Sequence, residues 1–319
     1  MRSLKINIGQ VNNKWKRFHA EQFVGLHRHP CLRVSDPIFT MGSCFAEEIR
    51  KALSTHGFKM LPDYGHIELD VDRFVIDTLP RRPHMNYYNT FTVLQEVMRG
   101  FGRLNLSNED CWEVPDRLWG ECSLIYQDPY KRLVFGKTRQ DLREALRRVN
   151  AVIDQGLREA KAFVFTFGMA EVFKNKSSGL IVSQRPLYGI GGGELETELH
   201  LSTFTENKNN VQAIIDIINS ERGNDVEIFL SVSPVPLQRT FSQSDVYMAN
   251  HAGKSLLRAV LEEVARENER VHYFPSWDLI GSLGPDAFTP EDGRHIKPSV
   301  VAQVIEGFVR SYIIRDDSF

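Results

Sequence analysis

The sequence contains few cysteines and no long apolar run. Four cysteines stand among 319 residues, and no two of them form a C-x-x-C pair. The cysteines therefore do not indicate the dense disulfide framework of a small secreted domain. No stretch approaches the roughly 20 consecutive apolar residues that a membrane-spanning helix needs, and residues 1–15 lack the apolar core of a signal peptide. We expect a cytoplasmic protein with reduced thiols and no membrane partner.

An excess of charge of either sign is also missing. Thirty-nine Lys and Arg residues stand against 41 Asp and Glu residues, which gives a formal net charge of -2 without a long run of one sign. Such a balance does not favour nucleic acid as a partner. The 42% of hydrophobic residues can bury a sizeable core. We expect a single domain over residues 1–319. It begins with an N-terminal arm, residues 1–35, that lacks clear periodicity.

Sequence motifs for cofactors are weak. The run Gly191-Gly192-Gly193 lacks the Lys-Ser/Thr of a phosphate-binding loop and the G-x-G-x-x-G spacing of a dinucleotide site, so we interpret it as a loop. His27, His29 and Cys31 alternate as side chains on one face of a strand do, but no fourth ligand stands nearby. We expect no metal and no organic cofactor.

Periodic signals become strong from Thr138 onward. Helical patterns alternate there with short, fully apolar runs that are typical of buried strands, and Pro298 opens a last helical pattern. Such alternation predicts a parallel sheet covered by helices on both faces, a three-layer α/β/α domain. Residues 60–135 are rich in aromatic residues, Pro and Arg without long apolar periods, and we expect them to be an irregular insertion over the active-site edge.

The stretch from Phe39 to Ala46 joins a short apolar run to a helical pattern. The run ends at Gly42, and the helix is expected to begin at Ser43. Serine is a good helix N-cap, but a hydroxyl beside free helix N–H groups also suits a nucleophile with an adjacent oxyanion site. Cys44 is a second candidate nucleophile, since a thiol at a helix N-terminus has a lowered pKa.

A second candidate segment precedes the last helix. Asp292 and His295 stand three residues apart in a turn that Gly293 permits, so the carboxylate can orient the imidazole as a general base. The same residues also suit an ordinary surface turn. The carboxyl ends of parallel strands meet at one edge of a sheet, and we expect this pair and Ser43 to lie there together.

The combination resembles the GSCFA family, whose name is spelled by Gly42-Ser43-Cys44-Phe45-Ala46, and which is similar to the SGNH (GDSL-like) esterases and acyltransferases. The resemblance runs from about Pro37 to Val309, and its last motif is Asp292-x-x-His295. It implies a flavodoxin-like SGNH fold, with Ser43 as nucleophile, His295 as general base and Asp292 as its orienting acid.

The resemblance also implies an oxyanion site, in which this sequence departs from the SGNH pattern. The group uses a glycine N–H, here that of Gly168, together with an asparagine, but Ala170-Glu171 stands where the asparagine is expected. We expect Asn89 either to substitute as donor or only to cap a helix, and Glu171 either to act in the site or to tie loops together. His200 lies where the family often carries a histidine, with a packing or solvent-facing position as the alternative, and Arg185 and Arg239 are possible substrate contacts.

These observations predict a serine esterase that removes or transfers an acyl group, with acetyl expected, on a small molecule or glycan. The carbohydrate substrate comes from the resemblance alone. The alternatives are a cytosolic O-acyltransferase and a non-catalytic carbohydrate-binding or scaffold protein on the same fold. The sequence leaves the oligomeric state open.

Overall fold

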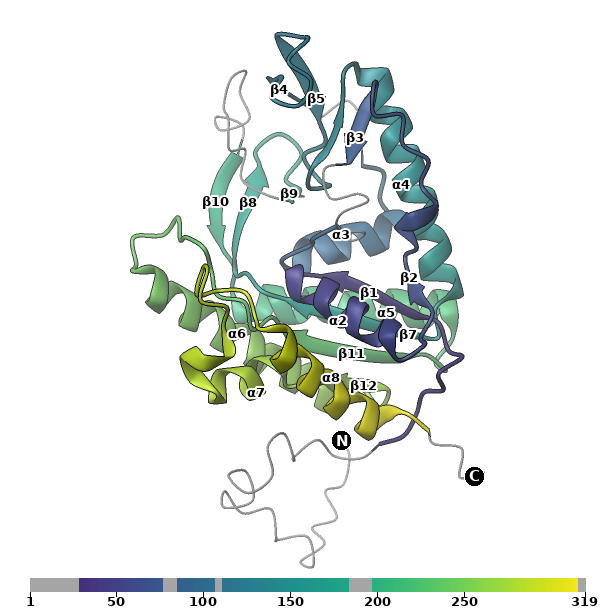
Figure 1. The fold of residues 1–319 in the computed structure, drawn as a ribbon, viewed down its shortest axis with the longest axis vertical. Coiled ribbons are helices and arrows are strands. Elements are labelled where there is room, and N and C mark those ends of the chain that lie inside the picture. Colours follow the sequence, from purple (N-terminus) through teal and green to yellow (C-terminus); the bar gives the residue numbers. More distant parts are fainter. Residues whose placement is uncertain (1–28, 77–84, 107–110, 184–196, 315–319) are drawn as a thin grey trace, which may run out of the picture.

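The protein is built around a five-stranded parallel sheet with the strand order β12-β11-β7-β1-β2 (Figure 1). The structure is a computed structural model that describes residues 29–76, 85–106, 111–183 and 197–314. Counted along the chain, the strand order is 2-1-3-4-5, the flavodoxin-like arrangement. The strands are β1 (Ile38–Gly42), β2 (Met60–Leu61), β7 (Ala162–Phe167), β11 (Glu227–Val232) and β12 (Val271–Tyr273).

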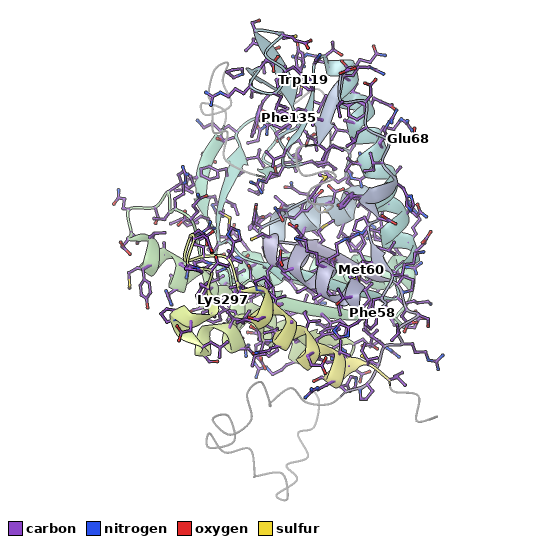
Figure 2. All side chains as sticks on the ribbon, viewed as in Figure 1. Phe58, Met60, Glu68, Trp119, Phe135 and Lys297 are labelled. Atoms are coloured by element: carbon purple, nitrogen blue, oxygen red, sulfur yellow. The ribbon has the colours of Figure 1, made fainter. Side chains whose placement is uncertain are left out.

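Alternate residues of these strands pack into two separate cores. Phe163 and Phe165 join one apolar cluster, whereas Val164 between them joins the other. Helices α2 (Cys44–Thr55), α7 (Ser276–Ser282) and α8 (Pro298–Tyr312) cover one face, and α4 (Arg139–Glu159), α5 (Phe204–Arg222) and α6 (Val246–Glu267) cover the other. Figure 2 shows side chains filling the space between these layers. Because both faces are covered, the strands are apolar throughout, and the predicted three-layer α/β fold is confirmed.

Helices α2, α4 and α8 begin where the sequence predicts. A capping box begins α4, since the Thr138 and Asp141 side chains each accept the other residue's backbone N–H. Helix α5 begins with a second capping box, formed by Thr203 and Glu206, and Pro298 occupies the first position of α8. Local capping chemistry and apolar periodicity therefore agree with the tertiary structure.

Two small antiparallel sheets lie beyond one end of the central sheet, in the upper part of Figure 1. One has the order β3-β6-β5-β4 and the other β10-β8-β9. Their strands are β3 (Phe74–Ile76), β4 (Trp112–Pro115), β5 (Leu124–Gln127), β6 (Val134–Gly136), β8 (Glu171–Asn175), β9 (Ile181–Val182) and β10 (Thr197–Leu201).

The segment 60–135 is thus more regular than the sequence predicts. It supplies β2 to the central sheet. Its described residues also contain a 3₁₀ turn, η2 (Tyr64–His66), the strands β3, β4 and β5, the start of β6, and α3 (Thr90–Gly100), which packs against α5. Sequence patterns do not reveal these strands because each has two to four residues. Strands this short are held by pairing with distant partners and leave no readable period-2 pattern.

The first described residues lie along the end of α8. The backbone N–H groups of His29 and Cys31 donate to the carbonyls of Ser311 and Tyr312, and Leu32 forms a parallel bridge with Ile313. The N-terminal arm expected over residues 1–35 is therefore docked from residue 29 onward, and its earlier part lies outside the described residues. Within the described ranges, no helix combines the length and the apolar character needed to cross a membrane.

Candidate active site

The turn between β1 and α2 requires glycine at position 42. Gly42 has a φ of +149°, and a Cβ on it would lie 2.3 Å from the backbone oxygen of Thr166. Without a side chain the end of β1 can press against β7, and the chain can turn sharply into the helix. This turn places Ser43 at the carboxyl end of the sheet as the N-cap of α2, where its Oγ accepts the N–H of Phe45 at 3.2 Å.

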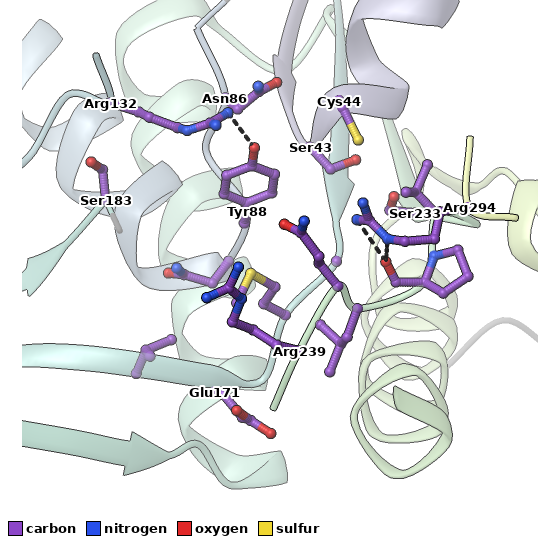
Figure 3. A pocket seen from close by; sticks show the side chains of 18 of the residues that line it. Ser43, Cys44, Asn86, Tyr88, Arg132, Glu171, Ser183, Ser233, Arg239 and Arg294 are labelled. Atoms are coloured by element: carbon purple, nitrogen blue, oxygen red, sulfur yellow. Dashed lines mark hydrogen bonds between the residues drawn. The ribbon is translucent and has the colours of Figure 1, made fainter. Parts of the chain in front are cut away.

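A cavity of about 420 Å³ opens at this edge of the sheet (Figure 3). Ser43, Gly168 and Ser233 line it, and each directly follows the carboxyl end of a parallel strand. Ligands of open α/β sheets bind at this place. Apolar residues complete the wall, among them Met169, Val172, Phe173, Val182, Val235, Leu237 and Phe241.

His295 also lines the cavity, and Asp292 holds its ring. The Nδ1 atom of His295 forms a short hydrogen bond with Oδ2 of Asp292. The other carboxylate oxygen accepts the backbone N–H groups of Arg294 at 2.8 Å and His295 at 3.0 Å. Those backbone donors hold the pKa of Asp292 well below its usual range. The carboxylate therefore stays ionised and fixes the proton of the imidazole on Nδ1, which leaves Nε2 as the basic atom.

The hydroxyl of Ser43 is engaged elsewhere. Its Oγ lies 3.0 Å from Oγ1 of Thr166, and no hydrogen bond joins Ser43 to His295 in the part of the chain that the structure describes. The serine is 2% exposed. The structure thus brings the two predicted residues to one cavity without a direct contact between them.

The backbone N–H groups of Ser43 and Gly168, at the expected oxyanion site, have hydrogen-bond partners within the protein. The N–H of Ser43 donates to both oxygens of Thr166, each at 3.0 Å, and the N–H of Gly168 donates to the carbonyl of Tyr88 at 2.8 Å. These groups already have partners because β1, β7 and the segment at Tyr88 pack together at this point. Sequence patterns do not register such tertiary hydrogen bonds. Gly168 still lines the cavity, where a Cβ on it would lie 3.3 Å from the Cβ of Ser233 and 3.6 Å from that of Ser43.

Two further expected site residues have structural partners. Asn89 is the N-cap of α3, and its Oδ1 accepts the N–H of Thr92 at 2.9 Å. The carboxylate of Glu171 accepts the N–H of Phe241 at 2.9 Å and the hydroxyl of Thr240 in a short hydrogen bond. Both residues line the cavity, but Asn89 mainly begins a helix and Glu171 ties the loop after β11 to β8.

His200 does not belong to the cavity. It lies on β10, outside the residues that line the pocket, and its Nε2 lies 2.9 Å from Oε1 of Glu206. Glu206 in turn caps α5. In the structure His200 therefore packs at the start of that helix, which is one of the two alternatives that the sequence leaves open.

Sequence reasoning missed Asn86. This residue bridges to Gly42, is 2% exposed, lines the cavity, and its Oδ1 has no hydrogen-bond partner. Its side chain also hydrogen bonds to the Tyr88 side chain. An extended segment places residues i and i+2 on one side, so Asn86 and Tyr88 face the cavity whereas Tyr87 points into the core. That alternation was the available signal.

A buried ion network holds the segments that carry Tyr88 and Arg132. Glu96 accepts hydrogen bonds from Tyr87 at 3.1 Å, Lys131 at 2.6 Å and Arg99 at 2.6 Å. Burial alone raises the pKa of Glu96, but the two cations outweigh it and lower the pKa to about 2. The residues that follow Tyr87 and Lys131 then meet at the cavity, where Arg132 donates to the Tyr88 hydroxyl at 2.6 Å.

Lys254 lies beneath the same cavity. It is 1% exposed, and its Nζ donates to the carbonyls of Ser233 at 2.7 Å and Val235 at 3.0 Å. Burial, with a smaller contribution from the nearby Arg294, lowers its pKa to about 7. The Lys254 amine therefore supports the loop after β11 directly behind Gly168, 3.5 Å from the position of a Cβ on that glycine.

Cys44 is a poor nucleophile in this setting. Burial raises the pKa of its thiol from the ordinary value, against the opposing charges of Lys254, Arg294 and Arg132. The expectation of a lowered pKa at the helix N-terminus is wrong because desolvation of the thiolate outweighs the favourable charges. The thiol stays protonated near neutral pH, which leaves Ser43 as the stronger candidate.

Arg239 lines the cavity, and the other remaining sequence candidates lie outside it. His27, Arg185 and Gly191-Gly192-Gly193 fall outside the described residues. His29 and Cys31 lie instead beside His272, with ligand atoms that are all within 4.8 Å of one another. The carboxylate of Glu227 accepts a hydrogen bond of 2.7 Å from Nε2 of His272. This cluster does not line the cavity, and the expectation that the protein needs no metal stays a prediction.

The chain is similar to known proteins in sequence and in fold. The GSCFA family model matches residues 37–308. Among solved structures, a Clostridium thermocellum family 3 carbohydrate esterase aligns with 87% of this chain and 94% of its own, at 9% sequence identity and a TM-score of 0.35. No curated protein matches the sequence.

Proposed function

The chain belongs to the GSCFA family, and from the geometry of the site we propose that it is a serine esterase or acyltransferase. The observation that carries the proposal is that Ser43 and His295 line one cavity although they lie near opposite ends of the chain, with the histidine fixed by Asp292. A nucleophile, a base and an acid that orients the base are the three groups that acyl transfer through a serine requires.

The proposed reaction begins when the Ser43 hydroxyl exchanges Thr166 for His295. Its Oγ bonds to the acyl carbon as its proton passes to Nε2 of His295, and Asp292 stabilises the resulting imidazolium. The ester bond to the leaving oxygen then breaks, and that oxygen takes the proton from His295. Water, or a hydroxyl of an acceptor, attacks the acyl-serine by the same steps in reverse. The acceptor decides between hydrolysis and transfer.

We infer that Asn86 takes the place of the asparagine missing beside Gly168. An amide nitrogen carries two hydrogens, and the side-chain hydrogen bond to Tyr88 uses at most one of them. Asn86 bridges to Gly42 and is therefore next to the nucleophile. The positive N-terminal end of α2 adds to the favourable potential there.

The substrate we propose is an O-acylated carbohydrate. The cavity of about 420 Å³ is large enough for a sugar ring with its acyl group. It combines apolar side chains, which suit the acyl group and the C–H faces of the ring, with buried polar atoms that suit hydroxyls. A free acyl chain alone would leave those polar atoms without partners.

The test is turnover of p-nitrophenyl acetate by the wild-type protein and three variants. Ser43→Asn keeps a helix-capping oxygen but no nucleophile, so we expect turnover at background with little loss of stability. His295→Ala should lower kcat by ~10²–10⁴, the usual worth of a general base. Cys44→Ala should stay within a few-fold of wild type. Turnover that survives in Ser43→Asn and disappears in Cys44→Ala would refute the serine mechanism.

One observation favours a second candidate, a carbohydrate-binding protein without turnover. The Ser43 hydroxyl is bonded to Thr166, and the expected backbone donors of the oxyanion site are occupied. In that case a folded wild-type protein would bind sugars, and Ser43→Asn would bind them equally well, while no ester tested is hydrolysed or transferred.

A further inference from the structure

The lining of the cavity carries a local excess of positive charge. Among its described lining residues are Arg132, Arg239 and Arg294, and Glu171 is the single carboxylate of that set. This is a formal excess of two positive charges, apart from His295, in a chain whose net charge is -2. The excess therefore belongs to the site and does not follow from overall composition.

The three arginines reach the cavity from different segments. Arg132 comes from the turn between β5 and β6, Arg239 from the loop after β11, and Arg294 from the segment before α8 (Figure 3). Arg294 donates to the carbonyl of Pro236 through Nε at 3.3 Å and Nη2 at 3.2 Å. Three independent parts of the chain thus deliver guanidinium groups around one space, at some distance from one another in the sequence.

The excess already counts the negative charge of Glu171, whose hydrogen bonds are made within the protein. The Glu171 oxygens accept hydrogen bonds from Thr240 and Phe241, so the carboxylate is committed to the loop after β11. The positive potential also extends to the nucleophile. Lys254, Arg294 and Arg132 all act to lower the pKa of the neighbouring Cys44 thiol, although burial outweighs them.

Buried polar atoms without partners line the same cavity. They are Oδ1 of Asn86, Oγ of Ser183 and Oγ of Ser233, on side chains that are 2%, 4% and 1% exposed. Each buried polar atom without a partner lowers the stability of the fold by ~1–3 kcal/mol. Three such atoms around one cavity therefore point to a ligand that supplies hydrogen bonds. Figure 3 shows Ser183 and Ser233 on opposite sides of the cavity.

We propose that the acylated carbohydrate that this site binds carries an anionic group, a carboxylate or a phosphate, and that Arg132 and Arg239 hold it. The inference rests on the proposed function for the acyl group and deepens it by naming the substrate class. Guanidinium groups bind carboxylate and phosphate oxygens through charge-assisted, often bidentate hydrogen bonds. Arg294, next to His295, lies closer to the reacting groups, so the anion is assigned to the other two.

The test is calorimetric binding to the full-length Ser43→Asn protein, which needs no turnover. The ligands are methyl β-glucuronide, glucose 6-phosphate and the neutral methyl β-glucoside. At least one anionic sugar should bind about tenfold or more tightly than the glucoside, a difference of about 1.4 kcal/mol. The anionic sugar that binds more tightly shows whether the site prefers a carboxylate or a phosphate. Added salt should reduce the preference, because screening weakens charge pairing at a cavity open to solvent.

Substitutions assign the preference to the arginines. Arg239 is exposed, so Arg239→Gln should fold normally and lose most of the preference, and Arg132→Gln combined with it should abolish the preference. Arg147→Gln is the matched control, since Arg147 is exposed on α4 and pairs with Glu144. Equal affinity for charged and neutral sugars, no binding of either anion up to about 10 mM, or a preference that survives the double substitution would each overturn the proposal.

The outcome is separable from that of the proposed function. Preferential binding of an anionic sugar by a protein that hydrolyses no ester would retain the anion site and reject the esterase. Turnover of p-nitrophenyl acetate by Ser43 without any anion preference would retain the esterase and reject the anion site.

Discussion

Two asparagines at the edge of the cavity, Asn86 and Asn89, differ in what their side chains contact. Asn89 is occupied as the cap of α3, whereas Asn86 has a buried oxygen without a partner and bridges to Gly42. The sequence offers both in one short segment, and the choice between them depends on which side of an extended backbone faces the cavity. Capping patterns identify Asn89 readily but say nothing about Asn86.

Replacing each asparagine by alanine should separate their roles. Asn86→Ala removes the proposed oxyanion donor, so kcat for p-nitrophenyl acetate should fall by ~10²–10³ while KM changes little. Asn89→Ala removes a helix cap, so its main effect should be a loss of about 1 kcal/mol in the free energy of unfolding. Steady-state kinetics and urea unfolding of both variants measure this. A kcat that falls equally in the two variants would contradict the assignment.

Lys254 makes stability depend on pH. Burial lowers its pKa in the folded protein to about 7 from the ordinary value of 10.5. Between these two values the unfolded chain binds more protons than the folded one, so this group makes the protein more stable as pH rises from about 7 to about 10.5. The contribution is lost as pH falls through the folded pKa, because the buried amine must then carry a charge.

The measurement is the difference in melting temperature between the wild-type protein and Lys254→Met across that range. Taking the difference cancels other groups that titrate in both proteins. We expect wild type to gain relative to the variant with rising pH. A difference that does not change with pH would show that Lys254 keeps an ordinary pKa.

At the scale of elements, the site depends on how neighbouring segments are held. The segment with Tyr87 and Tyr88 and the turn with Lys131 and Arg132 belong to different parts of the fold, and Glu96 on α3 fixes both. Breaking a buried ion pair by removing one partner leaves an uncompensated charge and costs ~3–5 kcal/mol. The network is therefore the structural basis for the place of Arg132 in the cavity.

Glu96→Gln should lower the free energy of unfolding by that amount at neutral pH. Because the pKa of Glu96 is depressed to about 2 from 4.5, its contribution is present above about 4.5 and is lost as pH falls toward 2. Urea unfolding at several pH values measures this. The exposed pair of Arg310 and Glu306 on α8 provides the control, since Glu306→Gln should change stability by less than about 1 kcal/mol. Equal effects of the two substitutions would contradict the buried network.

How far each element could be predicted depends on what holds it. The strands β7 and β11 are buried on both faces and are apolar runs in the sequence. The start of α4 is marked by the capping residues Thr138 and Asp141. The strand β2 has two residues and exists only through pairing with β1, so no local pattern marks it. The same limit applies to the small antiparallel sheets, whose strands gain their stability from distant partners.

At the scale of the whole molecule, the sheet explains why residues far apart in sequence share a cavity. All five strands run parallel, so Ser43, Gly168 and Ser233 emerge at one edge, and the segment before α8 brings His295 to them. This convergence follows from alternating helices and strands and could be predicted. The occupancy of the N–H groups of Ser43 and Gly168 could not, because it depends on the close approach of Thr166 and Tyr88.

The charge of the cavity shows the same division. Composition shows that the chain as a whole is nearly neutral, but it does not show whether charge gathers at one place. The arginines that surround the cavity are spread from residue 132 to residue 294. Only the fold brings them together around a space that contains unpaired polar atoms. The proposed substrate class therefore depends on the whole fold, whereas the proposed nucleophile is found within five consecutive residues.

The most direct test of the central claim is to locate the adduct of a fluorophosphonate probe by mass spectrometry of the proteolysed wild-type protein. The account predicts one modified side chain, Ser43, with labelling strongly reduced in His295→Ala and retained in Cys44→Ala. Modification of another residue, or a folded wild-type protein that turns over p-nitrophenyl acetate without any adduct on Ser43, would contradict the proposal that this serine is the nucleophile.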